Sequence, residues 1–361
     1  MGALFNIINV PLAYVLRFLA NLFNNDFAAA IAVFTLIINV VLIPISIKSQ
    51  KSAVQQMRIK PKMDDLRKRF GDDRQKMAAE QQKLYQDEGV SMSGGCLPMI
   101  IRLVIMFSIY SLILSPLTYM SGTGKSFVDE SKNKTDYIYT TITTELSDKS
   151  IKDYDDEKKA EYEQAKKDLS DIGWQGKQKE LEIINITRKD PEAFKNVLPA
   201  ELYAKIEKDL DYIIKKDNES QINYNLFGVE GLDLTETPKF SIDIFKKAEL
   251  NWIIPVSAFL AQILTSLVTM KINKKNNPDA PSMAGMMLTM PLISLFIGFG
   301  LPGGVGFYWV CSSLIGGLIQ AGVQLYYGPH KMLARERAKE LSKQCDFETK
   351  QLDKLAKDTQ E

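Results

Sequence analysis

Five long apolar stretches alternate with highly charged segments along this chain of 361 residues. A helix needs about 20 apolar residues to cross a bilayer, and each stretch approaches or reaches that length. We therefore predict an all-α polytopic membrane protein whose five spans form its transmembrane core. In chain order, spans 1 to 5 cover residues 27–47, 95–117, 252–270, 286–301 and 305–327.

A further apolar stretch, residues 4–23, precedes the five spans and differs from them because polar or small residues recur in it every three or four positions. These residues are Asn6, Asn9, Ala13, Arg17 and Asn21. On a helix they form one stripe, which favours an amphipathic helix lying in the membrane interface. An ordinary transmembrane helix is the alternative.

The segment between spans 1 and 2, residues 48–93, is polar and contains eleven Lys and Arg residues. A thin apolar stripe runs through it and breaks at Gly71-Asp72-Asp73. The stripe consists of Val54, Met57, Met63, Leu66 and Phe70. We predict a helical hairpin outside the membrane, and a merely solvated linker is the alternative.

The region between spans 2 and 3, residues 121–250, is long and polar and contains no stretch that could cross a bilayer. We expect a modest helical insertion here, with helices near 155–183 and 191–216. Spans 3 and 4 are joined by the polar loop 271–284. Only Pro302-Gly303-Gly304 separates spans 4 and 5, which predicts a tight turn.

Positive charge orients the spans, since short cytoplasmic loops are enriched in Lys and Arg. Lys and Arg residues lie close to the span ends in three segments, namely 48–93, 271–284 and the tail 328–361. Loop 271–284 has Lys271, Lys274 and Lys275, and the tail begins with His330, Lys331, Arg335 and Arg337. We therefore predict a cytoplasmic C-terminus, with region 121–250 and the Pro302 turn on the outer side.

The residue content argues against several classes of catalytic and transport function. The chain has 45 Lys and Arg against 44 Asp and Glu, and its single histidine, His330, excludes a serine–histidine or two-histidine metal site. No nucleotide-binding loop or nucleic-acid site is evident, and no cofactor is expected. No acidic residue lies in any span, which argues against proton- or cation-coupled transport. We predict a protein that is not an enzyme, with a transporter or channel as the alternative.

Polar residues share helix faces in three spans. They are Thr35, Asn39 and Ser46 in span 1, Gln262, Thr265, Ser266 and Thr269 in span 3, and Ser313, Gln320 and Gln324 in span 5. Polar side chains in spans generally face neighbouring helices or water rather than lipid. Plain helix packing, in which small polar residues also serve, is the alternative for the serines and threonines.

Arg102 is the one charged residue within span 2, and it lies roughly 10 Å along the helix from Gly95 at 1.5 Å per residue. An arginine near the centre of a span costs roughly 2.5–3.5 kcal/mol on insertion scales. We predict that it faces a hydrophilic groove open to the cytoplasm, although its long stem could instead reach the headgroups. The predicted groove residues are Arg102, Asn39, Thr35, Gln262, Thr265, Ser266, Ser313 and Gln320.

Six short motifs lie in fixed order along these segments and cover about residues 5–120 and 222–327. They are Thr35-Leu36-Ile37-Ile38 with Pro44, Pro61-Lys62-Met63, Gly94-Gly95-Cys96-Leu97-Pro98, Asn225-Leu226-Phe227-Gly228 with Asp233-Leu234, Met290-Pro291-Leu292-Ile293, and Leu301-Pro302-Gly303-Gly304-Val305-Gly306-Phe307-Tyr308-Trp309. Together they resemble the YidC membrane insertases, bacterial relatives of the mitochondrial Oxa and chloroplast Albino insertases.

This resemblance implies five core helices around a groove closed toward the outside, and passive insertion of membrane proteins without nucleotide hydrolysis. It implies a multi-pass protein of the bacterial cytoplasmic membrane. Its expected partners are nascent membrane proteins, the lipid bilayer, the Sec translocon, the ribosome and signal recognition components. An assembly chaperone without insertion activity is the alternative from another class.

Three features depart from the family pattern, and one of them is the tail after Gly328, whose eight Lys and Arg against seven Asp and Glu do not make it the strongly basic tail that would suit ribosome binding. The groove arginine of the family falls four residues after Thr35, where this chain has Asn39, whereas many members have glutamine at the position of Arg102. We interpret the pair as a relocated positive charge. The insertion at 121–221 is also unusual, because large outer domains in the family usually precede the first core span.

Overall fold

The structure is a computed structural model that describes residues 2–70, 73–89, 97–120, 125–152, 154–238, 250–276 and 284–358. Within these residues the chain is helical, and extended segments pair only at two isolated bridges. The chain divides into two compact units, which are described separately. Unit 1 comprises Met1–Leu36, Val104–Ala261 and Met290–Ser312, and unit 2 comprises Ile37–Leu103, Gln262–Thr289 and Ser313–Glu361.

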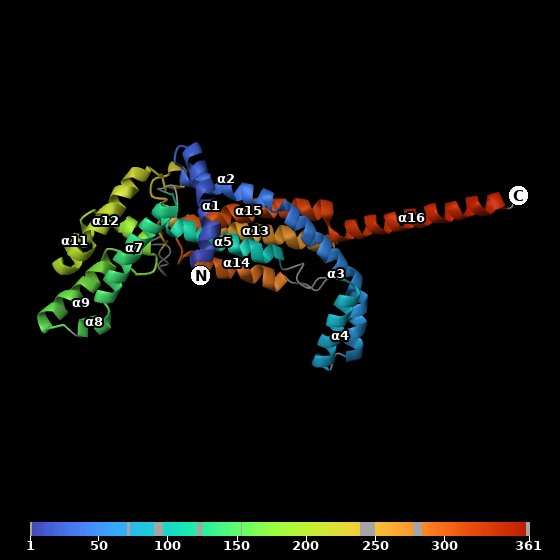
Figure 1. Cartoon of the computed structure of the whole chain (residues 1–361), viewed down its shortest axis with the longest axis horizontal. Helices are drawn as coiled ribbons and strands as arrows, with labels where there is room; N and C mark the ends of the chain where they lie inside the picture. The colour runs from blue at the N-terminus through green and yellow to red at the C-terminus, as the bar shows by residue number, and fades with distance from the viewer. Residues whose placement is uncertain are drawn as a thin grey trace. The chain divides into compact units, whose positions relative to one another are not determined.

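Figure 1 labels most of the helices along the chain. They are α1 (Gly2–Leu22), α2 (Phe27–Val41), α3 (Ile43–Phe70), α4 (Arg74–Asp87), α5 (Leu97–Leu114), α6 (Pro116–Met120), α7 (Lys125–Glu145), α8 (Asp148–Lys152), α9 (Asp156–Asp171), α10 (Lys179–Lys189), α11 (Ala193–Val197), α12 (Ala200–Ser220), the short η1 (Leu226–Gly228) and η2 (Leu250–Trp252), α13 (Ile253–Asn276), α14 (Ala284–Gly298), α15 (Gly303–Tyr327) and α16 (Pro329–Asp358).

Two segments of the described chain are long and apolar enough to cross a membrane, namely Leu250–Ile272 and the helical run that starts at Gly303. A third appears if α2 and the start of α3 count as one bent span. Shorter apolar helices cover Ile7–Leu22, Leu103–Leu114 and Met287–Gly298. These helices agree with an all-α membrane protein, whereas the five-helix core and its groove remain predictions.

Span 1 differs from the predicted continuous helix over 27–47. α2 ends at Val41, α3 begins at Ile43, and the two helices meet at a bend of 43°. Pro44 supplies the physical reason, since proline has no N–H to donate to the carbonyl four residues earlier and its ring crowds that turn. Span 2 likewise ends one turn early, because Pro116 starts the separate short helix α6.

In unit 1, α1 buries part of its polar stripe together with apolar residues such as Leu16, whereas Asn21 of the stripe is exposed. Asn9 is 1% exposed and donates from Nδ2 to Ser111 Oγ of α5 at 3.1 Å and to Tyr119 Oη of α6 at 3.4 Å. Ala13 of the stripe is also buried, whereas Phe18 is 65% exposed. Hydrogen bonding to α5 and α6 therefore accounts for the burial of Asn9.

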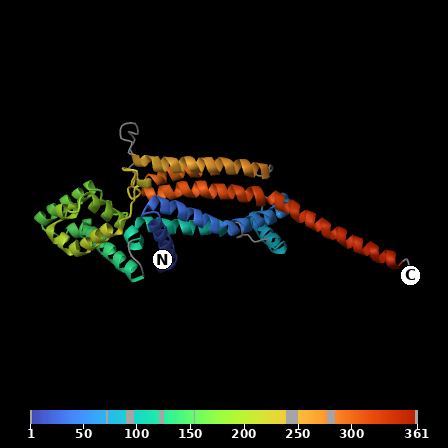
Figure 2. The same ribbon diagram turned by 90° about the horizontal axis from the view of Figure 1, so that it is seen from above.

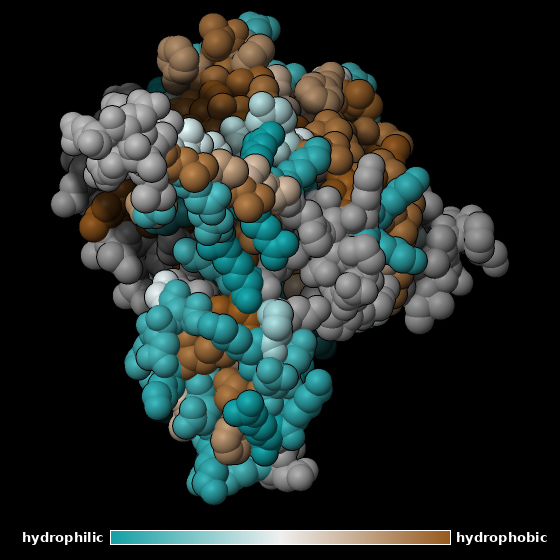
Figure 3. Space-filling model, turned by 90° about the vertical axis from the view of Figure 1, so that its right-hand side faces the viewer, coloured by the Kyte–Doolittle hydropathy of each residue, from teal (hydrophilic) through white to brown (hydrophobic). Residues whose placement is uncertain are grey.

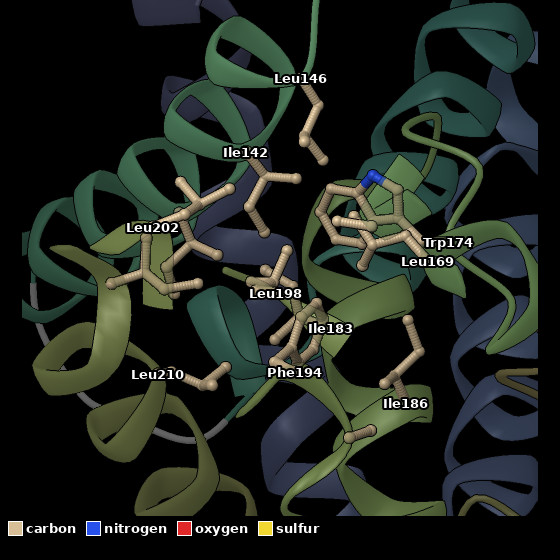
Figure 4. Close-up of a cluster of buried hydrophobic side chains, with 14 of the residues drawn as sticks. Ile142, Leu146, Leu169, Trp174, Ile183, Ile186, Phe194, Leu198, Leu202 and Leu210 are labelled. Carbon is tan, nitrogen blue, oxygen red and sulfur yellow. The ribbon is translucent and has the colours of Figure 1, made fainter. Parts of the chain in front are cut away.

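Helices α7 to α12, residues 125–220, are here called the inserted domain. They form a compact helical body around a continuous apolar core (Figure 4). The predicted helix over 155–183 is split into α9 and α10, and α7 was not predicted. Two glycines break the helix, because Gly173 and Gly176 adopt φ of +102° and +66°. The core residues labelled in Figure 4 are Ile142, Leu146, Leu169, Trp174, Ile183, Ile186, Phe194, Leu198, Leu202 and Leu210.

In unit 2, α3 and α4 lie side by side as a hairpin (Figure 1). Asp73 caps α4 by accepting from the Lys76 N–H at 3.1 Å, and Lys62 pairs with Glu88 across the hairpin. Figure 3 shows that its surface is mostly hydrophilic. Arg58 of α3 reaches Glu340 of α16 at 4.0 Å, beyond which α16 extends alone in Figures 1 and 2.

Candidate functional site

The predicted groove residues divide between the two units. Thr35 belongs to unit 1, where it is buried and its hydroxyl donates to the Ile31 carbonyl at 2.7 Å. The other seven belong to unit 2. Arg102 lies on α5, but its side chain is outside the described part of the structure, so its predicted contact with the groove stays a prediction. In the motif Gly94-Gly95-Cys96-Leu97-Pro98, the first three residues also lie outside the described part of the chain.

Asn39 joins α2 to α15 within unit 2. The side chain is 8% exposed, and a Cβ placed on Gly316 would lie 2.9 Å from Asn39 Oδ1. Only a glycine leaves room for the amide at this point. The sequence analysis placed Asn39 on a polar face, and the structure gives that face a specific neighbour on another helix.

Thr265 makes the corresponding contact from α13. A Cβ on Gly317 would lie 2.5 Å from Thr265 Cγ2, so the threonine methyl packs directly on the glycine backbone. The Thr265 hydroxyl donates to the Gln262 carbonyl at 3.1 Å within its own helix. At this residue, packing against a small neighbour therefore accompanies any contribution to a polar surface.

Further polar residues are buried in unit 2. Ser46, Gln50 and Ser52 of α3 and Gln324 of α15 are each less than a tenth exposed. Together with Asn39 they are here called the polar interior. Gln50 follows Ser46 by four residues, so the helical spacing that revealed Ser46 also pointed to it. Gln50 and Ser52 were not predicted as site residues, because they follow Lys48, the charged residue that marks the predicted end of span 1.

The polar interior is electrically neutral. Its members carry amide and hydroxyl groups, which donate and accept hydrogen bonds without a titratable charge at neutral pH. Gln324 Oε1 and Ser52 Oγ are buried and make no hydrogen bond within the described residues. A buried polar atom without a partner costs about 1–3 kcal/mol, so these atoms are suited to meet polar atoms of water or of another chain.

In unit 1, the turn between α14 and α15 is closed by an extended segment, residues 222–238, here called the collar. The Gly303 N–H donates to the Glu236 carbonyl at 2.8 Å, and the Gly304 N–H donates to the Leu234 carbonyl at 2.6 Å. A Cβ on Gly303 would lie 3.0 Å from Ile254 Cδ1 of α13. The turn therefore has no space for a larger residue.

The collar also holds the start of α2. Asn223 accepts from the Phe27 N–H at 3.0 Å and donates to the Asn25 carbonyl at 2.9 Å. The next residue, Tyr224, packs its ring against Phe27 with centroids 5.1 Å apart. One short segment thus contacts the first residues of both α2 and α15 in unit 1.

The inserted domain contacts the collar through α10. The Arg188 guanidinium lies 4.6 Å from the Tyr224 ring centroid and forms two hydrogen bonds of 2.6 Å to Asp217 of α12. Lys189 pairs with Glu236 at 2.6 Å. These contacts fix the inserted domain against the collar.

Glu180 of α10 ties the inserted domain to α6. Its carboxylate is 2% exposed and accepts from the Leu117 N–H at 2.5 Å, the Thr118 N–H at 3.1 Å and the Thr118 hydroxyl at 2.5 Å. Burial raises the pKa of Glu180 to about 7, although these donors favour the charged form. Nothing in the sequence pattern distinguished this glutamate from its solvated neighbours.

The described chain combines apolar helices that bury neutral polar residues, a tightly packed turn between α14 and α15, and a charged helical hairpin. These features are typical of a polytopic helical membrane protein. The sequence model of the 60Kd inner membrane protein family matches residues 18–161 and 203–328, more than half of the chain. The chain belongs to this family, which includes the YidC membrane protein insertases. The unmatched residues between 161 and 203 fall in the inserted domain.

Three curated relatives carry the name membrane protein insertase YidC. The one from Alkalihalophilus pseudofirmus is 39% identical over 111 residues, which are 29% of this chain and 44% of the relative. The Haemophilus influenzae relative is 41% identical over 101 residues, 28% of this chain and 18% of its own. The Nitratidesulfovibrio vulgaris relative is 37% identical over 113 residues, with 31% and 21% covered. The matched stretch spans less than half of each relative.

Proposed function

We propose that this protein is a membrane protein insertase that assists the insertion and folding of other membrane proteins in the bacterial cytoplasmic membrane. The observation that carries the proposal is the neutral polar interior buried in apolar helices of unit 2, with Asn39 on Gly316 as its best-defined contact. Family membership supports the same activity. The protein acts passively and hydrolyses no nucleotide.

In the proposed mechanism, a substrate hairpin first contacts the α3–α4 hairpin and then enters a hydrophilic groove in unit 2. Moving an unpaired amide or hydroxyl from water into an apolar medium costs roughly 2–7 kcal/mol. Amides and hydroxyls along the groove reduce this cost for polar atoms that must cross. The substrate's apolar segment partitions directly into lipid.

The groove surface is proposed to include the seven predicted residues of unit 2. These are Arg102, Asn39, Gln262, Thr265, Ser266, Ser313 and Gln320. Arg102 supplies the positive charge that attracts acidic outer tails of substrates. The Sec translocon, the ribosome and signal recognition components are proposed partners that deliver or receive substrates.

Reconstitution in liposomes tests the proposal. The purified protein and a small single-span substrate are mixed without ATP, and protease protection of the substrate's outer tail is measured. Protection above that of empty liposomes is the expected result. Substrate that binds the protein but stays protease-sensitive would instead identify an assembly chaperone without insertion activity.

The role of Arg102 is tested in the same assay with two substrates that differ only in their outer tails. Arg102→Ala is expected to cripple insertion of the acidic tail and to leave the neutral tail nearly unaffected, because only the acidic tail gains from the charge. Arg102→Lys keeps the charge and serves as the matched control. Unchanged insertion of the acidic tail by Arg102→Ala would refute a relocated groove charge.

A further inference from the structure

The collar contains a tight loop with two exposed apolar side chains. Residues 225–233, here called the outer loop, close through the bridge between Asn225 and Asp233 and a 2.8 Å hydrogen bond from Leu226 N to the Leu232 carbonyl. At its tip Phe227 is 57% exposed and Val229 is 47% exposed. Single exposed apolar side chains are common on protein surfaces, so these two indicate an apolar environment only if they belong to a larger apolar patch.

The backbone at Phe227 strengthens this argument. Its φ of +50° and ψ of 36° lie in the left-handed region, which glycine and asparagine adopt far more readily than an aromatic residue. The ring packs edge-to-face on Phe307 with centroids 5.7 Å apart. The loop therefore holds a large apolar side chain at a position where local preference favours a small or polar one.

The loop lies beside the ends of two candidate spans. Phe307 falls within the second turn of α15, which sets Phe227 level with the beginning of that helix. On the other side, a Cβ on Gly231 would lie 3.6 Å from Leu250 Cδ2. Leu250 is 53% exposed and lies in η2, directly before α13. The exposed apolar surface continues along α13 through Ile253, Val256 and Leu260.

We propose that the outer loop is a lipid anchor, which places Phe227 and Val229 in the boundary between headgroups and acyl chains of the leaflet where α14 joins α15. Lipid is the occupant because the apolar surface of the loop continues the exposed face of α13, a candidate span. Glu230, exposed at the tip, reaches the aqueous side. Since the collar also holds Gly304 and α10, the anchor sets the depth of the turn and of the inserted domain in the membrane.

Nitroxide depth measurements on the full chain in liposomes test this anchor. In a background with Cys96, Cys311 and Cys345 replaced by serine, a spin label is placed at Val229→Cys. Reference labels are placed at Leu260→Cys on the exposed face of α13 and at Asn218→Cys on the exposed side of α12. The anchor predicts that the Val229→Cys label collides more with oxygen than with a water-soluble nickel complex, as the Leu260→Cys label does.

Two results would overturn the anchor. Nickel accessibility equal to that of the Asn218→Cys label would place the loop in water. Shielding from both reagents would mean that protein, either residues 239–249 or a second copy, covers the loop.

A second pair of variants keeps the loop folded while changing its tip. Asparagine tolerates the left-handed backbone of Phe227 but is polar, whereas tyrosine keeps the ring. We expect Phe227→Asn to raise the nickel accessibility of the Val229→Cys label and Phe227→Tyr to leave it unchanged. An identical response to both variants would show that the ring does not anchor the loop. These measurements do not depend on insertase activity.

Discussion

Asn39 illustrates what happens to a polar residue within an apolar helix. The sequence placed it on one face with Thr35 and Ser46 but left open whether that face meets water or another helix. In the structure the amide lies against Gly316, where a Cβ would approach Oδ1 to 2.9 Å. The polar face was predictable from spacing, whereas the glycine partner was not, because it lies 277 residues further along the chain (316 − 39).

A double-mutant cycle tests this contact. Gly316→Ala should destabilise the protein by about 1–3 kcal/mol through overpacking, and Asn39→Ala in the same chain should recover much of that loss by removing the clash. Gly322→Ala is the matched control on α15, since no atom lies within 4 Å of its Cβ position. Melting temperatures in detergent provide the measurement. Additive effects of the two substitutions would contradict the contact.

Glu180 makes a pH-dependent contribution to stability. Its pKa in the folded protein is about 7, against about 4.3 for an unperturbed glutamate, because burial and the nearby Asp217 disfavour its charge. The folded state therefore retains a proton that the unfolded state loses between these two values. Stability falls as pH rises from about 4.3 to 7 and is lower by about 4 kcal/mol above that window.

Replacing Glu180 with glutamine should remove this loss. Glu180→Gln is neutral at every pH and keeps an oxygen for the Leu117 and Thr118 N–H groups, so we expect the inserted domain to gain stability at pH 8 relative to the parent protein. The urea midpoint, followed by Trp174 fluorescence with Trp252 and Trp309 replaced by phenylalanine, measures it at pH 5 and pH 8.

Glu182 supplies the control for that substitution. Its two carboxylate oxygens accept the N–H groups of residues 175 to 178 at 2.8–3.0 Å. Glutamine would turn an amino group toward some of these donors, so Glu182→Gln should destabilise the domain at both pH values. A parent protein whose urea midpoint does not change between pH 5 and pH 8 would contradict the role of Glu180.

At the scale of elements, prolines and glycines determine where several helices end. Pro44 divides span 1 into α2 and α3, and Pro116 ends α5 one turn early. The glycines of the predicted turn begin α15 instead, because the collar carbonyls of Leu234 and Glu236 accept their N–H groups. A local pattern cannot reveal hydrogen bonds from a segment about 70 residues away (303 − 234 = 69).

The packing of that turn is testable at Gly304. A side chain there would meet Ile113 at 3.0 Å and the Leu234 carbonyl at 3.2 Å. We expect Gly304→Val to separate the turn from the collar, to cost about 1–3 kcal/mol, and to make the collar a site of protease cleavage. Gly300→Ala, whose added Cβ stays 3.5 Å from its nearest neighbour, should do neither. An uncleaved collar in Gly304→Val would show that the turn is not held this way.

At the scale of the whole molecule, the part of the chain that matches the family model excludes much of the inserted domain. The family model leaves out residues 162–202, yet these residues contribute Phe194, Ile183 and Ile184 to a fully buried core. The sequence analysis expected only a modest helical insertion, because its apolar residues are spread thinly along the chain. Their convergence from α7, α9, α10 and α12 produces the core.

The orientation of the chain is a prediction from charge that one native residue can test. Cys345 is exposed on α16, and a cytoplasmic tail predicts that a membrane-impermeant maleimide labels it in inverted vesicles but not in intact spheroplasts. The background has Cys96 replaced by serine, and Asn218→Cys with Cys345→Ser reports the opposite side. Labelling of Cys345 in intact spheroplasts would reverse the predicted orientation.

The sequence by itself determined the class of protein and the helical character of its apolar stretches, because these follow from composition and from helical period. Only the tertiary structure decided that Asn39 and Thr265 pack on adjacent glycines of α15, that Glu180 caps α6, and that the collar closes the turn at Gly303. The reason is physical: each of these contacts joins residues far apart in the chain, and its energy depends on burial that exists only once the helices have packed.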